Sequence, residues 1–373
     1  LGELEALERS PFGHPTNRFV LELSLARLAY EEGRFEDSTS WLDRAEVRLH
    51  ARGPGEEFGA AVNPRVHLAT QRVRTLLASH APREVLVVER DRLAQEIERR
   101  FSVFELVPPR AAGLGFLYQA ARRAWFAAYT EASIAVSGEA EGSRAALELL
   151  VAAQRIGSLA RSIGARAVSL KEIRETLVPA DGGLLVFLPA PLRGHVFALD
   201  GDGVVHADLM GEAQLRPLLE ELRHSFDALL HARADPSSEM LAAEREVAIR
   251  AGRALLPAGI ADRIGDWEAL TIVGADLLGD TPLEFVIRGD EPLALSHAVA
   301  FLPSLPLGVA LLQREALRRG SDDECLLVVV PRGFDPRLNL PDLPFEQPAL
   351  VSLLEPYGDA HTWKPNRGLA LGS

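Results

Sequence analysis

The stretch from residue 183 to residue 209, GLLVFLPAPLRGHVFALDGDGVVHADL, decides the fold that we expect for this chain. It begins with a continuous apolar run, GLLVFLPA at 183–190, which is typical of a strand buried on both faces. Residues 193–209 then alternate between apolar and polar on both sides of the tetrapeptide DGDG at 200–203. Because aspartate and glycine favour tight turns between strands, this segment predicts a β-hairpin.

Helices and further strands alternate after the hairpin. Two amphipathic helices are predicted at 212–232 and 238–256. Three more apolar strands follow, with a helix at 306–319 between the last two: ALTIVGA at 269–275, AVAFLPS at 298–304 and CLLVVVP at 325–331. Continuous apolar strands that alternate with helices indicate an α/β sandwich, a sheet covered by helices on both faces.

Before residue 180 the pattern is helical nearly throughout. Residues 19–50 place apolar side chains at three- and four-residue steps on both sides of Gly33, which predicts a helical hairpin that turns at this glycine. The hairpin resembles a tetratricopeptide (TPR) unit, because small residues occur where paired helices approach closely, at Ala26, Ser38 and Ala45. Larger side chains are expected in the seam between the two helices: Leu28, Phe35, Trp41 and Leu42.

Further helices are predicted between this hairpin and the strands. They lie at 64–79, 83–101, 111–137 and 141–164, and the last two, joined by Ser137-Gly138-Glu139, are candidates for a degenerate second unit.

The composition is that of a globular protein with an acidic charge balance. Of its 373 residues 47% are hydrophobic and 25% are charged, and the length suffices for two or three domains. The formal net charge of −13 argues against a general attraction to nucleic acid or to an anionic membrane surface. No apolar run reaches the roughly 18 residues of a membrane-spanning helix, and one cysteine allows no internal disulfide. We therefore expect a cytoplasmic protein with no nucleic-acid or membrane partner.

Familiar catalytic signatures do not occur in the sequence. It has no GxxxxGK[ST] phosphate loop, no HExxH zinc helix and no GxSxG nucleophile elbow, and the glycines at Gly113 and Gly115 do not follow a strand. With one cysteine and ten scattered histidines, a structural zinc site has almost no support. We predict no metal and no cofactor.

Several polar residues remain as candidates for a site. His195 and His206 lie on opposite arms of the hairpin, where they either face each other as ligands or occupy ordinary sheet positions, the interpretation that we favour. His297 precedes a strand and is interpreted as a strand-edge residue. Acidic residues in turns and loops are interpreted as structural, with metal binding as the alternative for the carboxylates that follow the strand at 269–275: Asp200, Asp202, Asp276, Asp280 and Glu284.

The order of these features resembles the CHAT family, the caspase-like peptidase domains associated with TPR repeats. The resemblance begins near residue 146 with the helix ALELLVAAQRIGSLARSIGARAVSLKEIRETL and continues through the strand GLLVFLPA, the DGDG hairpin and the helical insert. It extends to the C-terminus through LTIVGADLLGDTPLEFVI, HAVAFLPSLPLGVALL and CLLVVVPRGFDPRLNLPDLPFEQPAL. No single motif is specific, so the resemblance depends on their common order.

The resemblance implies a fold class and a domain organisation. The fold is an N-terminal TPR-like helical domain followed by a caspase-like α/β/α sandwich. We place the helical region at 1–165, a non-catalytic first half of the sandwich at 166–320 and the start of the catalytic half at 321–373. In this family a histidine within a His-Gly pair activates a cysteine that comes at the end of a later strand. The cysteine thiolate then attacks the scissile carbonyl of a peptide bond.

The C-terminal residues depart from the family pattern, because no strand followed by His-Gly occurs after 325–331. His361 is the sole histidine after Cys325 and is followed by Thr362, so neither His361 nor any other residue of this chain is assigned a catalytic role. Cys325 is interpreted as a packing residue, since the acidic residues at 322–324 disfavour a thiolate there. The dyad is expected beyond Ser373, on a second chain, or not at all, and this chain alone is predicted to be inactive.

Two functions of different classes follow from the sequence. In the first, the chain is the N-terminal part of a caspase-like cysteine peptidase, cut from a longer protein at one or both ends, whose helical region recognises a protein partner or substrate. In the second, it is a non-catalytic interaction or regulatory module with a degenerate CHAT domain. The loop after 325–331 offers two polar candidates for substrate contact, Arg337 and Asp342, and an exposed loop without such a role is the commoner alternative.

Overall fold

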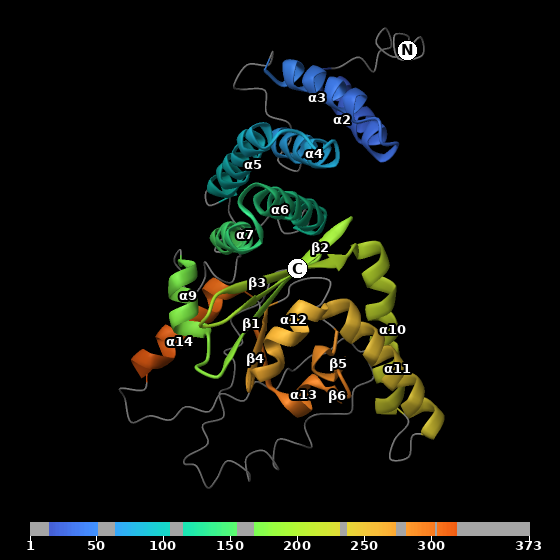
Figure 1. The fold of residues 1–373 in the computed structure, drawn as a ribbon, viewed down its shortest axis with the longest axis vertical. Coiled ribbons are helices and arrows are strands. Elements are labelled where there is room, and N and C mark those ends of the chain that lie inside the picture. Colours follow the sequence, from blue (N-terminus) through green and yellow to red (C-terminus); the bar gives the residue numbers. More distant parts are fainter. Residues whose placement is uncertain are drawn as a thin grey trace, which may run out of the picture. The chain divides into compact units, whose positions relative to one another are not determined.

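The structure is a computed structural model of the 373-residue chain (Figure 1). It describes residues 15–50, 64–104, 115–154, 168–231, 237–273, 281–302 and 304–318. The predicted strand at 325–331 and the expected start of a catalytic half at 321–373 lie outside the described residues.

Within the described residues, five strands form one mixed sheet. In spatial order they are β3 (Val204–Met210), β2 (Arg193–Leu199), β1 (Gly182–Leu188), β4 (Ala269–Val273) and β7 (Ala298–Leu302). The β1–β2 and β2–β3 pairs are antiparallel, whereas the β1–β4 and β4–β7 pairs are parallel. The predicted hairpin is therefore confirmed as β2–β3, and the strands predicted before and after it are confirmed as β1, β4 and β7.

The central strand β1 is buried along its whole length, as its continuous apolar sequence predicts. Leu184, Val186 and Leu188 belong to one hydrophobic cluster, whereas Leu185 and Phe187 belong to a second. Because successive side chains of a strand point to opposite faces, the two clusters lie on opposite faces of the sheet.

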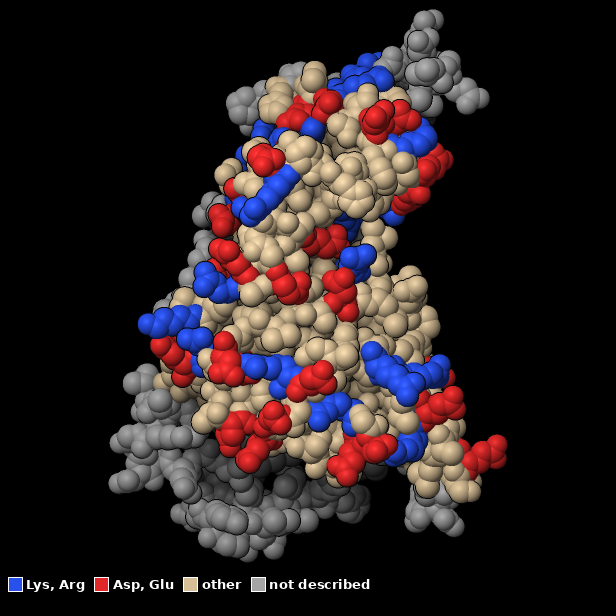
Figure 2. Space-filling view, viewed as in Figure 1, with Lys and Arg blue, Asp and Glu red and all other residues tan. Residues whose placement is uncertain are grey.

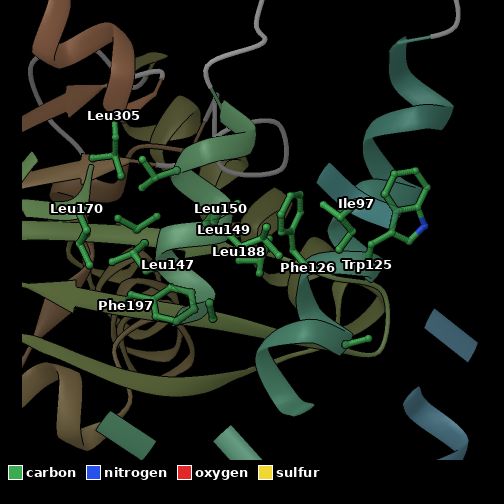
Figure 3. Packing of buried hydrophobic residues seen from close by; sticks show 14 of the residues in the cluster. Ile97, Trp125, Phe126, Leu147, Leu149, Leu150, Leu170, Leu188, Phe197 and Leu305 are labelled. Carbon is green, nitrogen blue, oxygen red and sulfur yellow. The ribbon is translucent and has the colours of Figure 1, made fainter. Parts of the chain in front are cut away.

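The first cluster joins the sheet to six helices. These are α4 (Pro64–Ala78), α5 (Arg83–Phe104), α6 (Gly115–Ser137), α7 (Glu139–Gln154), α9 (Leu170–Leu177) and α14 (Leu305–Arg318). Figure 3 shows Phe126 of α6 and Leu147 of α7 beside Leu188 and Phe197 of the strands. The last two helices of the N-terminal region therefore share a core with the sheet.

The second face of the sheet is covered by α10 (Glu212–His231), α11 (Ser238–Leu255) and α12 (Ala258–Arg263). The first two confirm the amphipathic helices predicted after the hairpin. Gly252 of α11 packs so closely on the backbone of Ile287 that a Cβ atom there would meet the Ile287 carbonyl oxygen.

Short elements complete this part of the chain. Residues 287–292 form a two-stranded ribbon that turns at Gly289, where φ is 64°. The short elements are η2 (Ile264–Asp266), η4 (Leu283–Phe285), β5 (Ile287–Arg288), β6 (Glu291–Pro292) and α13 (Leu293–Ser296).

The N-terminal helices pack as consecutive pairs in the described residues. Preceding the α6–α7 pair are α2 (Pro15–Glu31), α3 (Phe35–His50), α4 (Pro64–Ala78) and α5 (Arg83–Phe104). The α2–α3 pair contacts the α4–α5 pair, which in turn contacts the α6–α7 pair (Figure 1). The α2–α3 pair turns at Gly33 and the α6–α7 pair at Gly138, with φ angles of 72° and 84°, so both predicted turns are confirmed. The chain is thus a mixed helical and α/β protein, as expected.

The seam of the first pair agrees in part with the expectation. Leu42 is fully buried and Trp41 packs against the same small cluster, as predicted. Leu28 is 48% exposed, however, so its predicted place in the seam is wrong. The helical period instead turns Ala26 and Ala29 of α2 inward, where both are fully buried.

Polar contacts connect the first helical pair to the second. Ser38 and Thr75 form a buried hydrogen bond of 2.9 Å between α3 and α4. Glu46 accepts hydrogen bonds from Arg72, at 2.7 Å, and from Arg92. Burial raises the pKa of Glu46, but the two guanidinium groups outweigh it and hold the pKa below its usual value. The pairs are therefore joined by ion pairs in addition to apolar packing. Among the described helices, none is long and apolar enough to cross a membrane.

Candidate functional site

The sequence candidates divide into those that the structure describes and those that it does not. The following candidates lie outside the described residues: Asp276, Asp280, Cys325, Arg337, Asp342 and His361. Glu284 lies half-buried in η4. The remaining candidates lie on the β2–β3 hairpin or at the entrance to β7.

The hairpin register brings His195, His206 and Asp208 to one face of the sheet. His195 of β2 is directly opposite Asp208 of β3, and Phe197 is directly opposite His206. Because side chains two residues apart share a face, all three polar side chains point the same way as Phe197, toward α6 and α7. His195 is fully buried, His206 is nearly so, and the Asp208 side chain is 52% exposed.

Three side-chain atoms converge on this face. His195 Nδ1 lies 3.0 Å from His206 Nε2 and 3.3 Å from Asp208 Oδ1. His206 Nε2 lies 3.7 Å from the same carboxylate oxygen. The other Asp208 oxygen accepts a 3.3 Å hydrogen bond from Arg193. We call these three side chains the hairpin triad.

Two carboxylates from the helices flank the hairpin triad. His206 Nδ1 donates a 2.6 Å hydrogen bond to Glu139, the first residue of α7. His195 Nε2 is 4.0 Å from Glu131 of α6 and has no hydrogen-bond partner, although it is buried. The arrangement therefore depends on the packing of the α6–α7 pair against the hairpin.

The environment sets the charge of two members of the hairpin triad. Burial is the main cause that holds the pKa of His206 below its usual value, and the Glu139 hydrogen bond opposes this effect. The hydrogen bond from His195 is the main cause that lowers the pKa of Asp208, and burial opposes it. At neutral pH His206 is therefore neutral and Asp208 is ionised.

The sequence indicated only part of this arrangement. The two histidines do face each other, which was one of the two alternatives for them. Asp208, Glu131 and Glu139 were not candidates. A signal for Asp208 exists in the His-Ala-Asp spacing of β3, since residues 206 and 208 share a face.

Asp200 and Asp202 are turn residues, as predicted. Asp200 Oδ1 accepts backbone hydrogen bonds from Asp202, at 2.9 Å, and from Gly203, at 3.2 Å. Arg263 of α12 pairs with Asp200 at 2.5 Å, and the Trp267 indole donates to its second oxygen at 3.3 Å. Burial raises the pKa of Asp200, but Arg263 and the turn amides outweigh it and hold the pKa below its usual value.

A groove of about 780 Å³ lies beside this turn, between α7, α9 and α12. Side chains of both charges line it: Glu141, Arg144, Glu148, Lys171, Arg174, Asp202 and Arg263. Since the opposite charges are mixed, the groove does not select a ligand of one sign.

His297 is buried at the entrance to β7. Its Nδ1 atom donates a 2.6 Å hydrogen bond to the Trp267 carbonyl oxygen. This bond ties the start of β7 to the residues before β4, so the predicted role of a strand-edge residue is confirmed.

No family model matches the chain, and no curated protein matches its sequence.

Proposed function

We propose that this chain is the N-terminal part of a TPR–CHAT caspase-like cysteine peptidase. The observation that supports the proposal is the order of elements: helical pairs, α9, the β1–β2–β3 strands, the α10–α11 insert, β4 and β7. The resemblance to CHAT domains implies this same order. A mixed sheet with helices on both faces also suits a caspase-like α/β/α sandwich.

In this proposal the helical pairs bind a protein partner or a protein substrate. Helical hairpins that pack in series present extended surfaces, which suit protein ligands. Figure 2 shows basic and acidic side chains interspersed on one face of the molecule, which favours a protein over a polyanion as the ligand. Exposed apolar side chains are also available on α2, α3 and α5: Val20, Leu28, Val47, Val85 and Val88.

Peptide-bond cleavage requires a thiol and a histidine that activates it. The described residues contain no cysteine, because Cys325 is the only one in the sequence and lies outside them. We therefore assign the His-Cys dyad to a segment beyond Ser373 or to a second chain.

The natural polypeptide that contains this chain tests the peptidase proposal. Its coding sequence should continue, after Ser373 or on a co-encoded chain, into a strand followed by His-Gly and a later strand that ends in cysteine. A cysteine-directed peptidyl fluoromethyl ketone should then label that distal cysteine. The Cys325→Ala variant should be labelled to the same extent and should cleave protein substrates as the wild type does.

Two outcomes would contradict this proposal. One is a coding sequence that stops at Ser373 with no co-encoded catalytic half. The other is the loss of labelling and cleavage in Cys325→Ala while its circular dichroism stays unchanged. The first outcome favours the alternative function, a non-catalytic interaction module. The absence of a cysteine among the described residues is consistent with this alternative.

A further inference from the structure

We propose that the hairpin triad, His195, His206 and Asp208, is a three-ligand site for a divalent transition-metal ion such as Zn²⁺. The sequence led to the opposite expectation, because the strand register brings the three ligands together and the carboxylates that flank them come from two distant helices. The site is independent of the proposed peptidase activity.

The separations within the hairpin triad match a tetrahedral metal centre. The three candidate ligand atoms, His195 Nδ1, His206 Nε2 and Asp208 Oδ1, are 3.0, 3.3 and 3.7 Å from one another. Tetrahedral ligands at the usual bond length of about 2.0–2.1 Å from zinc lie about 3.4 Å apart. One ion can therefore contact all three atoms with small side-chain adjustments.

The ligand types are those that select a transition metal. Two imidazole nitrogens and one carboxylate oxygen suit Zn²⁺ and its neighbours in the first transition row better than Ca²⁺ or Mg²⁺, which prefer oxygen ligands. Asp208 keeps Oδ1 for the metal, because Arg193 binds Oδ2. Asp208 is also the exposed member, so water can reach the fourth position.

Each histidine has a carboxylate on the side away from the triad centre. His206 donates its Nδ1 proton to Glu139 at 2.6 Å, which leaves the Nε2 lone pair facing the centre. A carboxylate that holds the second nitrogen of a ligating histidine is a recurrent feature of metal sites, since it fixes both ring orientation and tautomer.

The tautomer of His195 distinguishes a metal site from a simple hydrogen bond between the histidines. Without a metal, a neutral His195 with its proton on Nδ1 donates that proton to His206 Nε2 or to Asp208, which leaves the bare His195 Nε2 toward the Glu131 carboxylate, 4.0 Å away. Two acceptors then face each other where His195 Nε2 is buried and has no hydrogen-bond partner. A metal on Nδ1 moves the proton to Nε2, which points it at Glu131 and removes this conflict.

The metal would act as a clamp between the hairpin and the α6–α7 pair. Its ligands lie on β2 and β3, whereas the carboxylates that orient them lie on α6 and α7. An ion that binds the folded chain and not the unfolded chain raises stability in proportion to the logarithm of its concentration.

Metal binding by the full chain tests the site. After treatment with EDTA and removal of the chelator, isothermal titration with Zn²⁺ should show one ion bound per chain, and the melting temperature should rise. Co²⁺ in place of Zn²⁺ should give the visible absorption of a tetrahedral centre. Asp208→Asn and His206→Gln should each weaken binding by at least tenfold. Glu139→Gln, which removes only the orienting carboxylate, should weaken it about 10–100-fold.

His224→Gln is the matched control, because this histidine is exposed on α10, away from the hairpin triad. It should bind Zn²⁺ as tightly as the wild type. Circular dichroism should confirm that the half-exposed Asp208→Asn variant remains folded. Failure of the folded wild-type chain to bind one Zn²⁺ would overturn the proposal. Equal affinity of Asp208→Asn, His206→Gln and His224→Gln would overturn it as well.

Discussion

At the residue scale, Asp200 shows how one side chain can hold a turn and attach it to a helix. Its carboxylate caps the DGDG turn through backbone amides and also accepts hydrogen bonds from Arg263 and Trp267. The sequence identified the turn from local chemistry alone. The partners on and after α12 lie more than 60 residues away and carry no local signal.

We expect Asp200→Asn to lower the free energy of unfolding at pH 7 by about 1–2 kcal/mol, because the amide retains the turn contacts and loses the ion pair with Arg263. The effect should depend on pH. The pKa of Asp200 is lower in the folded chain than in the unfolded chain, so its contribution is complete above the unfolded pKa of about 4. The contribution is lost as the pH falls through the folded pKa.

Urea unfolding of both proteins from pH 7 to pH 3 measures this dependence. The difference between wild type and Asp200→Asn should shrink toward the acid end of the series. A difference that stays constant, or one that grows as the pH falls, would show that the ion pair is not its cause.

At the element scale, the close contact between α11 and β5 requires glycine, the residue without a side chain, at position 252. Gly252 lies inside α11, where glycine weakens a helix, yet it is buried against the Ile287 carbonyl. The close approach explains the glycine, because any Cβ atom would push the helix away from the ribbon of β5 and β6.

Gly252→Ala should therefore lower the free energy of unfolding by about 1–3 kcal/mol, although alanine is the better helix former. Gly259→Ala in α12 is the matched control, since nothing lies within 4 Å of its added Cβ atom. The control should be neutral or should stabilise by up to about 1 kcal/mol. Chemical denaturation of the two variants compares them directly. Equal effects would mean that the backbone of β5 moves aside at no cost.

Most of the secondary-structure elements could be predicted from the sequence, whereas contacts between distant elements could not. Apolar periodicity and turn residues are local, so the helices, the buried β1 strand and the hairpin were all predictable. The hairpin triad was only half predictable, because the histidines belong to the hairpin whereas Glu131 and Glu139 come from helices packed on it. The prediction for Leu28 was wrong because Leu28 lies at the border between the buried and the exposed face of α2. Only the contacts with other helices decide on which face such a residue lies.

At the scale of the whole molecule, the N-terminal helices contribute to two hydrophobic clusters of very different size. The small cluster of the first helical pair contains Leu42 and includes Leu68 of α4, whereas the large cluster extends from α4 to the sheet and contains Phe197. The α2–α3 pair has a small core to which α4 contributes Leu68, and the later pairs share the large core with the sheet.

Truncation of one side chain in each core should separate the two. Leu42→Ala should cost about 2–5 kcal/mol, mostly as local opening, so that hydrogen exchange accelerates in 15–50 while β1 stays protected. Phe197→Ala should cost a similar amount but should accelerate exchange in α6, α7 and β1 together. Hydrogen exchange with mass spectrometry distinguishes these patterns. If Leu42→Ala accelerated exchange in β1 as well, the first pair would belong to the same cooperative unit as the sheet.

The strand order has a consequence for synthesis on the ribosome. The antiparallel half of the sheet, β1–β2–β3, is contiguous from Gly182 to Met210, so it can assemble as soon as this segment emerges. The parallel neighbour of β1 is β4, which begins only at Ala269. During the interval β1 presents a fully apolar strand with one open edge, the kind of template on which nascent chains aggregate. The α10–α11 segment is translated in this interval, and its early packing on the sheet would cover the same strand from one face.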